Sequence, residues 1–588
     1  MKDYMKINKL FLGVVSIAAL FTSCGEELDY HEYDNQKKDY IEKNFAFVDG
    51  LVSNIYSQLD YDYGDNYGGG MLASACDEAV YCNTSASINY FTNGAWSPTT
   101  PQSVVWTSSY AAIADCNNYL ANFMGLTFPE EKNKTDYALN YHQYERSPYE
   151  VKLLRAYFYF LLVRQYGDVP YYTKELTAEE RNALTRTPAQ DVLDSIMTTC
   201  DEVKEFLPED YTNLGEYTMA PAQTGRFNKM CAIALKARAA MYAASPLFDK
   251  QGQGNDAAKW KIAADACKEL IDVCTPLRIR IGYYERTWGE TNYQSGAANN
   301  AELIYARRVN DYGTPESRNY PVGIKSAGAG GNCPSETLAE AFETKNGYDV
   351  ILTENGWKCD DPKFDPTKPF ANRDPRFALI FACNGDTKWP TSNADPLEIY
   401  YGGTSGEPKV GASPTGYYLK KLLDGNVDLS STGTKKTSKH SWMTFRLGEF
   451  YLNYAEALFK WQGSYTAKPE GHTMNALDAV NQLRNRTRIK MPLLTATNVT
   501  TNEQFWEKYK KERFAELCFE GHRFYDIRRW KEPVKTVKLL KMTKNEDGSI
   551  NYRLETKDLG WEDKMYFFPI PLSDIIKSGG ALTQNEGW

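Results

Sequence analysis

One cysteine near the start of the chain, Cys24, stands where a thiol could be covalently modified. It follows a basic start and a nearly unbroken apolar run from Phe11 to Phe21. That run is too short to span a bilayer as a helix and has the layout of a secretory signal. A cysteine directly after two small residues is typical of a bacterial lipoprotein processing site, although Phe21 stands where leucine is usual. We therefore predict a signal peptide over residues 1–23 and lipidation of Cys24; the alternative is an ordinary signal peptide with an incidental cysteine.

Hydrolysis of a glycosidic bond would need a pair of carboxylates. Glycoside hydrolases place two of them roughly 5–9.5 Å apart, and the chain has 76 Asp and Glu residues, so suitable pairs can arise by chance. No GxSxG, HExxH or P-loop pattern is present. A surface glycoside hydrolase therefore stays an alternative without a motif of its own, and no catalytic residue is predicted.

Metal chemistry has little support in the sequence. There is no CxxC pair and only five histidines, which argues against zinc. Asp60, Asp62 and Asp65 are spaced as in a calcium loop, but the closing glutamate of the EF-hand pattern is missing. No cofactor or metal site is predicted, and structural calcium is left open without assigned ligands.

The cysteine content bears on redox chemistry. Eleven cysteines remain after Cys24, an odd number that cannot all pair. We expect most of them to be small buried hydrophobic residues, which suits an exported protein from an anaerobic environment.

Composition narrows the class of protein. With 588 residues and 42% hydrophobic content, the chain can bury a full core, and no later segment has eighteen uninterrupted apolar residues. The net charge of −9 argues against nucleic acid as a partner and against attraction to an anionic membrane surface.

The aromatic content is unusual, at 14% of residues with 42 tyrosines against 26 phenylalanines. Tyrosine is favoured where one edge of the ring must remain in water, as at interfaces and ligand surfaces. Flat amphipathic rings also suit sugars, which present C–H groups on one face and hydroxyls around the rim.

The elements that would position such residues are mainly helical. Residues 24–40 are acidic and predict a flexible tether, and residues 41–588 predict one domain. Residues 60–100 and 280–440 are rich in Gly, Asn, Pro and aromatic residues and predict long irregular insertions. A short strand pair is predicted around Tyr552–Leu554 and Met565–Phe568. Apolar spacing predicts helices over 45–59, 103–124, 149–166, 189–206, 228–244, 256–274, 336–342, 446–461, 474–488 and 502–520, so that the scaffold covers about 41–60, 101–275 and 445–530.

Five segments in a fixed order carry a family resemblance. They are LRAYFYF running into YGDVP (154–170), NRDPR (372–376), RLGEFYLNYAEA (446–457), ERFAELCFEGHRFYDIRRW (512–530), and FPIP (568–571) followed by TQNEGW (583–588). Behind a lipoprotein signal, this order resembles the SusD/RagB family of outer-membrane glycan-binding lipoproteins over nearly the whole mature chain.

The resemblance implies a mainly α fold: a right-handed stack of tetratricopeptide-like helix pairs, a large irregular ligand-binding half and minor β-hairpins. It also implies a SusC-like TonB-dependent β-barrel transporter as partner, which the protein caps like a lid at the exterior face of the outer membrane. Members are typical of Bacteroidota, capture oligosaccharides for import and perform no covalent chemistry.

The charged residues of these segments also have a physical interpretation. Glu516 and Glu520 can meet Arg513 and Arg523 within one or two helical turns, and such pairs would clamp helices together when buried. We interpret them as structural, together with Glu449 and Glu456. Gly167 and Pro170 predict a helix stop followed by a turn.

A sugar site needs aromatic platforms and planar polar side chains, because each hydrogen bond gains only about 0.5–1.5 kcal/mol against water. Two stretches have both: Asp77 to Trp96, and Tyr283 to Tyr320. In relatives an aromatic residue in the early loop stacks on sugar, and Trp96 is its match here, with packing beneath a loop as the equal alternative. For Arg373, a salt bridge to Asp374 or a neighbour competes with ligand contact. The predicted carbohydrate-binding residues are Asp77, Trp96, Trp288, Tyr312, Tyr320, Arg373 and Tyr400.

Three functions remain in view. The first is capture of oligosaccharides for the transporter. The second is the surface hydrolase. The third is a helical-repeat scaffold that binds only protein and uses its aromatic residues as an interface.

Overall fold

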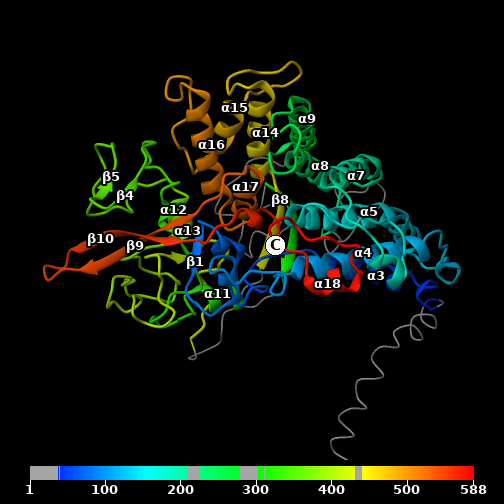
Figure 1. The fold of residues 1–588 in the computed structure, drawn as a ribbon, viewed down its shortest axis with the longest axis horizontal. Helices are drawn as coiled ribbons and strands as arrows, with labels where there is room; N and C mark the ends of the chain where they lie inside the picture. The colour runs from blue at the N-terminus through cyan, green and yellow to red at the C-terminus, as the bar shows by residue number, and fades with distance from the viewer. Residues whose placement is uncertain are drawn as a thin grey trace, which may run out of the picture.

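A computed structural model describes residues 38, 40–209, 211, 225–277, 302–309, 313–430 and 440–588. The predicted signal peptide, Cys24 and nearly all of the tether lie outside the described residues, as do Trp288 and Tyr312. In Figure 1 the helices gather on the right and at the top, while short strands and loops occupy the left. The mainly helical fold that the sequence predicts is confirmed.

The helical half is built from long helices that pack on their neighbours in chain order. Each helix packs on the next, from α4 to α5, α7, α8 and α9, and then α14 and α15. Small residues such as Ala237 and Ala263 are fully buried at these contacts, which lets the helices approach closely. The long helices of this half are α3 (Phe45–Ser57), α4 (Val104–Asn122), α5 (Tyr137–Tyr166), α7 (Ala189–Val203), α8 (Lys229–Ala244) and α9 (Ala257–Cys274).

Helix ends follow local chemistry. Asn228 and Asp256 cap α8 and α9 by accepting hydrogen bonds from backbone amides of the first turn. Gly167 ends α5 with φ of +70°, a conformation that favours glycine, so the predicted helix stop is confirmed. The predicted start of that helix at Tyr149 is wrong, because α5 begins at Tyr137 and continues through Pro148.

The C-terminal helices close the scaffold. They are α14 (Leu447–Gln462), α15 (Ala476–Arg484), α16 (Asn502–Leu517), α17 (Arg523–Arg529) and α18 (Leu572–Lys577). The shorter helices elsewhere are α6 (Ala178–Asn182), α11 (Thr314–Asn319), α12 (Glu336–Ala339) and α13 (Phe377–Ile380).

All sheets in the described residues are antiparallel pairs. The longest joins β9 (Thr536–Lys544) to β10 (Ile550–Asp558), with Arg553 opposite Lys541. The predicted pairing of residues 552–554 with 565–568 is therefore wrong, because Met565 lies in a short 3₁₀ helix. The other pairs are β1 (Ala79–Tyr81) with β3 (Asn332–Pro334), β2 (Leu303–Val309) with β8 (His440–Arg446), β4 (Ile351–Thr353) with β5 (Gly356–Lys358), and β6 (Phe381–Ala382) with β7 (Tyr418–Leu419).

Two large clusters of buried apolar residues form the cores of the helical half and the irregular half. The larger runs through the helical stack, and the second lies under the irregular half around Phe342, Phe381 and Tyr417. All eleven cysteines after Cys24 are described and carry free thiols, nine of them buried. The prediction that most of them are small buried hydrophobic residues is confirmed. Within the described ranges, no helix has the length and apolarity needed to cross a membrane.

Candidate functional site

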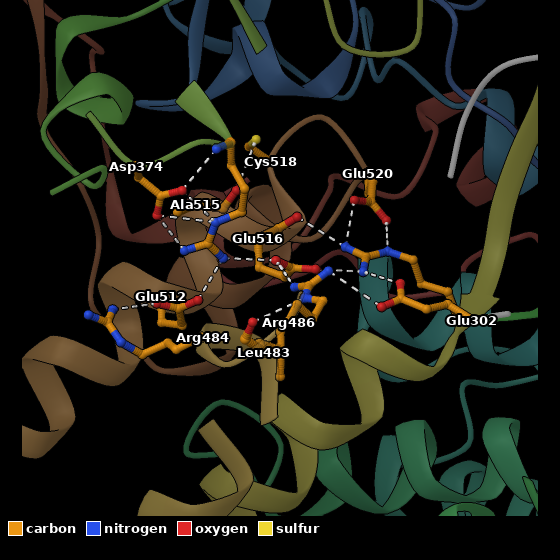
Figure 2. Close-up of polar contacts among 12 residues, drawn as sticks. Glu302, Asp374, Leu483, Arg484, Arg486, Glu512, Ala515, Glu516, Cys518 and Glu520 are labelled. Atoms are coloured by element: carbon orange, nitrogen blue, oxygen red, sulfur yellow. Dashed lines mark hydrogen bonds and ion pairs between the residues drawn. The ribbon is translucent and has the colours of Figure 1, made fainter. Parts of the chain in front are cut away.

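Several charged residues of the family-like segments join others in a buried cluster, most of which is drawn in Figure 2. Glu516 lies at its centre and pairs with Arg446 (2.8 Å), Arg376 (2.9 Å) and Arg486. Burial alone would raise the pKa of Glu516, but these guanidinium groups hold it well below the usual range. We call this the buried charge cluster, and its members are Glu302, Asp374, Arg376, Lys421, Arg446, Arg484, Arg486, Glu512, Glu516 and Glu520.

The structural interpretation of these residues is confirmed, although the predicted partners of Glu516 and Glu520 are wrong. Arg513 pairs with Asp526 at 2.6 Å rather than with Glu516. The reason is that three arginines from other segments reach α16: Arg446 at the end of β8, Arg376 just before α13 and Arg486 just after α15. The two other glutamates also serve structure, since Glu449 pairs with Arg238 and Glu456 with Arg529.

Four of the predicted sugar-binding residues are buried. Trp96 has 2% of its side chain exposed and packs edge-on against Phe91, Phe568 and Trp588, with ring centroids 4.6–4.9 Å away. The open platform predicted for Trp96 is therefore wrong here, and the alternative of packing beneath a loop holds. Asp77 is 1% exposed and pairs with both nitrogens of one edge of the Arg523 guanidinium.

Tyr320 and Arg373 are likewise inside the irregular half. Tyr320 is fully buried, and its hydroxyl donates to the carbonyl of Asp424 at 2.5 Å. Arg373 is 3% exposed and donates to the backbone carbonyls of Ala339 and Phe342. Its burial argues against the predicted sugar contact, and within the described residues its hydrogen bonds go to carbonyls rather than to Asp374 or a neighbouring carboxylate as the alternative proposed.

Tyr400 is the predicted residue that lies beside an open groove. It is half-buried, and Lys544 lies 5.1 Å from its ring centroid. The Tyr400 hydroxyl donates to Glu398 at 2.8 Å, and this bond lowers the pKa of the Glu398 carboxyl. Its neighbour Tyr401 is 63% exposed and lines the groove itself.

We call this the hairpin groove. It has a volume of about 440 Å³, within the range of ligand pockets, and lies between the loop 399–416 and the β9–β10 hairpin. Its lining residues are Ile399, Tyr401, Glu407, Ser413, Gly416, Leu540, Lys541, Met542, Thr543, Asn551, Arg553 and Glu555.

The β9–β10 hairpin contributes polar side chains to one side of the groove. Alternate residues of a strand share a face, so Asn551, Arg553 and Glu555 project together, while Tyr552 and Leu554 pack on the second apolar cluster. Arg553 and Glu555 form an ion pair and are 69% and 38% exposed. Their planar groups are thus held side by side at the surface.

The loop is fixed against the hairpin by backbone contacts. The amide of Tyr401 donates to the carbonyl of Met542 at 2.8 Å, and Leu540 donates to Thr415 at 3.2 Å. Gly416 has φ of +80°, and an added Cβ would lie 2.6 Å from the carbonyl oxygen of Leu540, so only glycine allows this approach. Glu407 pairs with Lys541 at 2.8 Å across the groove.

The groove thus offers an exposed ring beside carboxylate, amide and guanidinium groups. The sequence prediction named Tyr400, the neighbour of Tyr401, but none of the residues that line the groove. The alternation from Ile550 to Asp558 is a period-two signal for a strand with one polar face and could have indicated some of them. Of the other hollows, a cavity lined by Asp60 and Arg164 holds only about 50 Å³. A groove of about 680 Å³ along α9 has no Phe, Tyr or Trp among its described lining residues.

The three aspartates considered for calcium are engaged separately. Asp60 accepts a hydrogen bond from Tyr157, Asp62 accepts from backbone amides, and Asp65 pairs with Arg318. Across the described part of the chain, no group of three or more His, Cys, Asp or Glu side chains could hold a metal ion.

Comparison with known proteins agrees with this architecture. Residues 285–588 match the model of the SusD family, and residues 28–241 match a family described as starch-binding and associating with the outer membrane. SusD-like protein P2 of Formosa agariphila is 22% identical over 494 residues, which cover 83% of this chain and 80% of that protein.

Solved structures share the fold. A SusD-like protein from Bacteroides fragilis superposes with a TM-score of 0.74 at 24% identity, covering 94% of this chain and 98% of that one. A laminarin-binding SusD-like protein superposes with a TM-score of 0.54 at 19% identity, covering 92% and 99%. With the family model spanning more than half of its residues, the chain belongs to the SusD/RagB family.

Proposed function

We propose that this protein is a cell-surface glycan-binding lipoprotein that captures an oligosaccharide in the hairpin groove and hands it to a SusC-like TonB-dependent transporter. The observation that carries the proposal is the exposed Tyr401 ring beside Asn551, Arg553 and Glu555. Some relatives support it by name, among them a SusD-like carbohydrate-binding protein and a laminarin-binding one. The role is binding without covalent chemistry.

The groove suits this role physically. The face of Tyr401 can cover the C–H side of a sugar ring, while carboxylate, amide and guanidinium groups bind pairs of hydroxyls. Because water competes for each hydroxyl, apolar stacking must supply much of the affinity. Tyr401 is therefore the residue on which binding should depend most.

Calorimetric titration of the purified protein with plant, microbial and host oligosaccharides tests the site. Tyr401→Ala should weaken binding of the best ligand at least tenfold, about 1.4 kcal/mol, whereas Tyr401→Phe retains the ring and the affinity. Tyr348→Ala is the matched control, since Tyr348 is 41% exposed but does not line the groove. Equal affinity in wild type and Tyr401→Ala, with both folded by circular dichroism, would remove the groove as the site.

The same samples separate binding from hydrolysis. A pure binding protein leaves the bound glycan intact, so reducing ends should not accumulate during long incubation. A steady release of reducing ends would instead favour a surface hydrolase, and tight association with a transporter without any glycan binding would favour the protein-only scaffold.

We propose further that Cys24 carries the lipid anchor and that the protein faces the cell exterior. Cys24→Ser should abolish acylation detected by mass spectrometry and release the protein from the outer membrane. Membrane retention of the unacylated variant would contradict the anchor. Co-purification of the acylated protein with a TonB-dependent β-barrel tests the partner.

A further inference from the structure

No exposed residue of α3 or α4 is charged. The two helices pack side by side at the lower right of Figure 1, and the structure describes both of them throughout. The exposed residues of α3 are Ala46, Phe47, Gly50, Ser53, Asn54 and Ser57. The exposed residues of α4 are Val104, Thr107, Ser108, Ala111, Asn118 and Ala121. We call the surface that they form the α3–α4 face.

The two charged residues of these helices are engaged by neighbouring segments. Asp49 accepts a hydrogen bond from Gln143 at 2.8 Å, and Asp115 accepts one from Gln58 at 2.7 Å. Helix α7 of the same scaffold is different, since its exposed residues are Asp191, Asp194, Thr198, Asp201 and Glu202. Soluble surfaces carry charge at about a quarter to a third of positions, whereas the cores of protein interfaces are depleted of it. The α3–α4 face therefore has the composition of an interface.

Large apolar side chains surround the face. The rings of Tyr40 and Phe47 lie 5.0 Å apart at one end of it. At the other end, α18 is fixed to α4 by a hydrogen bond from Trp106 Nε1 to Asp574 at 2.7 Å. Twelve large apolar side chains are exposed in the described part of the chain, and six of them lie here: Tyr40, Phe47, Val104, Met124, Leu572 and Ile576. Apolar side chains gathered in this way mark an interaction surface.

The area of the face suits a partner protein. α3 and α4 have 13 and 19 residues and are therefore about 20 and 28 Å long. Because a helix with its side chains is about 10 Å wide, the two helices present roughly 500 Å² outward, and α18 extends this area. The smallest stable protein interfaces bury about 600 Å² on each partner. The face can thus form most of such an interface.

The start of the described chain lies beside this face. Lys38, which precedes α3, donates from Nζ to Oδ1 of Asn122 at the end of α4, at 3.1 Å. Fourteen residues lead from Cys24 to Lys38, and an extended chain reaches at most about 3.5 Å per residue, or about 50 Å. With the proposed lipid on Cys24, this end of the face lies within that distance of the bilayer.

Charge distinguishes the candidate occupants of the face. The segment between Cys24 and Lys38 is acidic and would bring unpaired charges onto an uncharged surface. Helices that lie on lipid carry lysine and arginine toward the headgroups, and the exposed residues of α3 and α4 include neither. A protein embedded in the same membrane fits better, because the cores of protein interfaces lack charge.

We propose, on the basis of the function proposed above, that the α3–α4 face is the surface on which the TonB-dependent transporter docks. The transporter would bury the apolar side chains at both ends of the face, and the hydroxyl and amide groups between them would bind its polar groups. The hairpin groove lies at the other end of the long axis in Figure 1, so a glycan can enter it while the face is covered.

Two glutamates placed on the face test the docking in the full-length protein. The tagged protein is purified in mild detergent from outer membranes of the bacterium that produces it, and the co-purified TonB-dependent barrel is quantified by mass spectrometry. Ser53→Glu combined with Ala111→Glu should reduce the recovered barrel at least tenfold, because the buried charges would have no partner. Thr198→Glu, on the exposed side of α7, is the matched control and should retain the barrel.

Melting curves establish that the variants are folded. If the double variant does not fold, Ile576→Glu replaces it and should reduce the recovered barrel at least threefold. A photo-cross-linking amino acid at position 111 should link the protein to the barrel, and links only to a second copy, to the tether or to lipid overturn the proposal. Equal recovery of the barrel with the double variant and with the control overturns it as well. A wild-type protein that recovers no barrel contradicts the proposed function itself, and the docking surface with it, so the two failures are distinguishable.

Discussion

The buried charge cluster and the hairpin groove are built from the same residue types and use them in opposite ways. In the cluster, Arg446 and Glu516 are 1% and 0% exposed, and each contacts several opposite charges. In the groove, Arg553 and Glu555 form one ion pair open to solvent. Desolvation makes the difference, because a buried charge must be paired whereas an exposed one can exchange its partner for a ligand.

The comparison shows that arginine and glutamate in a sequence do not by themselves distinguish a structural clamp from a binding surface. The cluster joins segments from both halves of the chain, since Arg376 comes from the irregular half and Glu512 from α16. The cluster therefore fixes the irregular half, which carries the loop of the groove, against the helical half. The two regions should respond differently to substitution.

The largest effect is expected at Arg446. Arg446→Met removes one of the cationic partners of Glu516 and of Glu520, and leaves these buried carboxylates with fewer compensating charges. Loss of one member of a buried pair costs about 3–5 kcal/mol, measured as the free energy of unfolding in urea. Lys541→Met, which breaks the partly exposed pair with Glu407, should cost at most about 1 kcal/mol. An equal loss of unfolding free energy in the two variants would contradict the expected difference between buried and exposed ion pairs.

The next effect is expected at Trp96, which the sequence placed on the binding surface and the structure places in an aromatic core. Trp96→Ala should cost about 3 kcal/mol of stability, because a large side chain is removed from among Phe91, Phe568 and Trp588. The folded protein should bind glycan with unchanged affinity. A stable variant that has lost binding would return Trp96 to the site.

A smaller, pH-dependent effect is expected at Glu336, a buried carboxyl that pairs with no arginine among the described residues. Burial raises the pKa of Glu336 to about 8, and its Oε2 accepts from the Tyr417 hydroxyl at 2.7 Å. The folded state therefore keeps a proton that the unfolded state releases above about pH 4.5, so this group costs stability as pH rises toward 8.

Glu336→Gln preserves the neutral shape and removes the titration. Its stability relative to wild type should rise by about 2.5 kcal/mol between pH 5 and pH 7, because each pH unit contributes about 1.4 kcal/mol per proton and the unfolded glutamate is already mostly ionised at pH 5. Urea unfolding at both pH values measures the change. A difference between the two proteins that stays constant with pH would mean that Glu336 is ionised in the fold.

Most of the fold was predictable, because the sequence features that indicate a helix lie within the helix itself or next to its ends. The apolar spacing in α4, α8 and α9 and the caps at Asn228 and Asp256 lie within single segments of sequence. The partners of Glu516 were not predictable, because Arg376 and Arg486 lie 140 and 30 positions away and meet it only through the tertiary fold.

The site was predicted less well for a related reason. Trp96 and Tyr320 have aromatic rings that could stack on a sugar. Whether these rings are exposed depends on distant segments of the chain that can cover them. The C-terminal Phe568 and Trp588 cover Trp96, and the backbone around Asp424 receives the Tyr320 hydroxyl. Tyr401 stays exposed because the loop turns back at Gly402 and Gly403 to lie along β9, a path that composition alone does not specify.

The smallest effect on stability is expected at Arg553, the exposed counterpart of Arg446. Arg553→Ala should change the free energy of unfolding by less than about 0.5 kcal/mol, because its side chain is 69% exposed and its ion pair with Glu555 is open to water. The same variant should weaken glycan binding several-fold in calorimetry, since a guanidinium that binds paired hydroxyls is lost from the groove. A stable Arg553→Ala protein with full affinity would confine binding to the Tyr401 side of the groove, whereas a large loss of stability would show that the hairpin depends on its surface charges as the interior does.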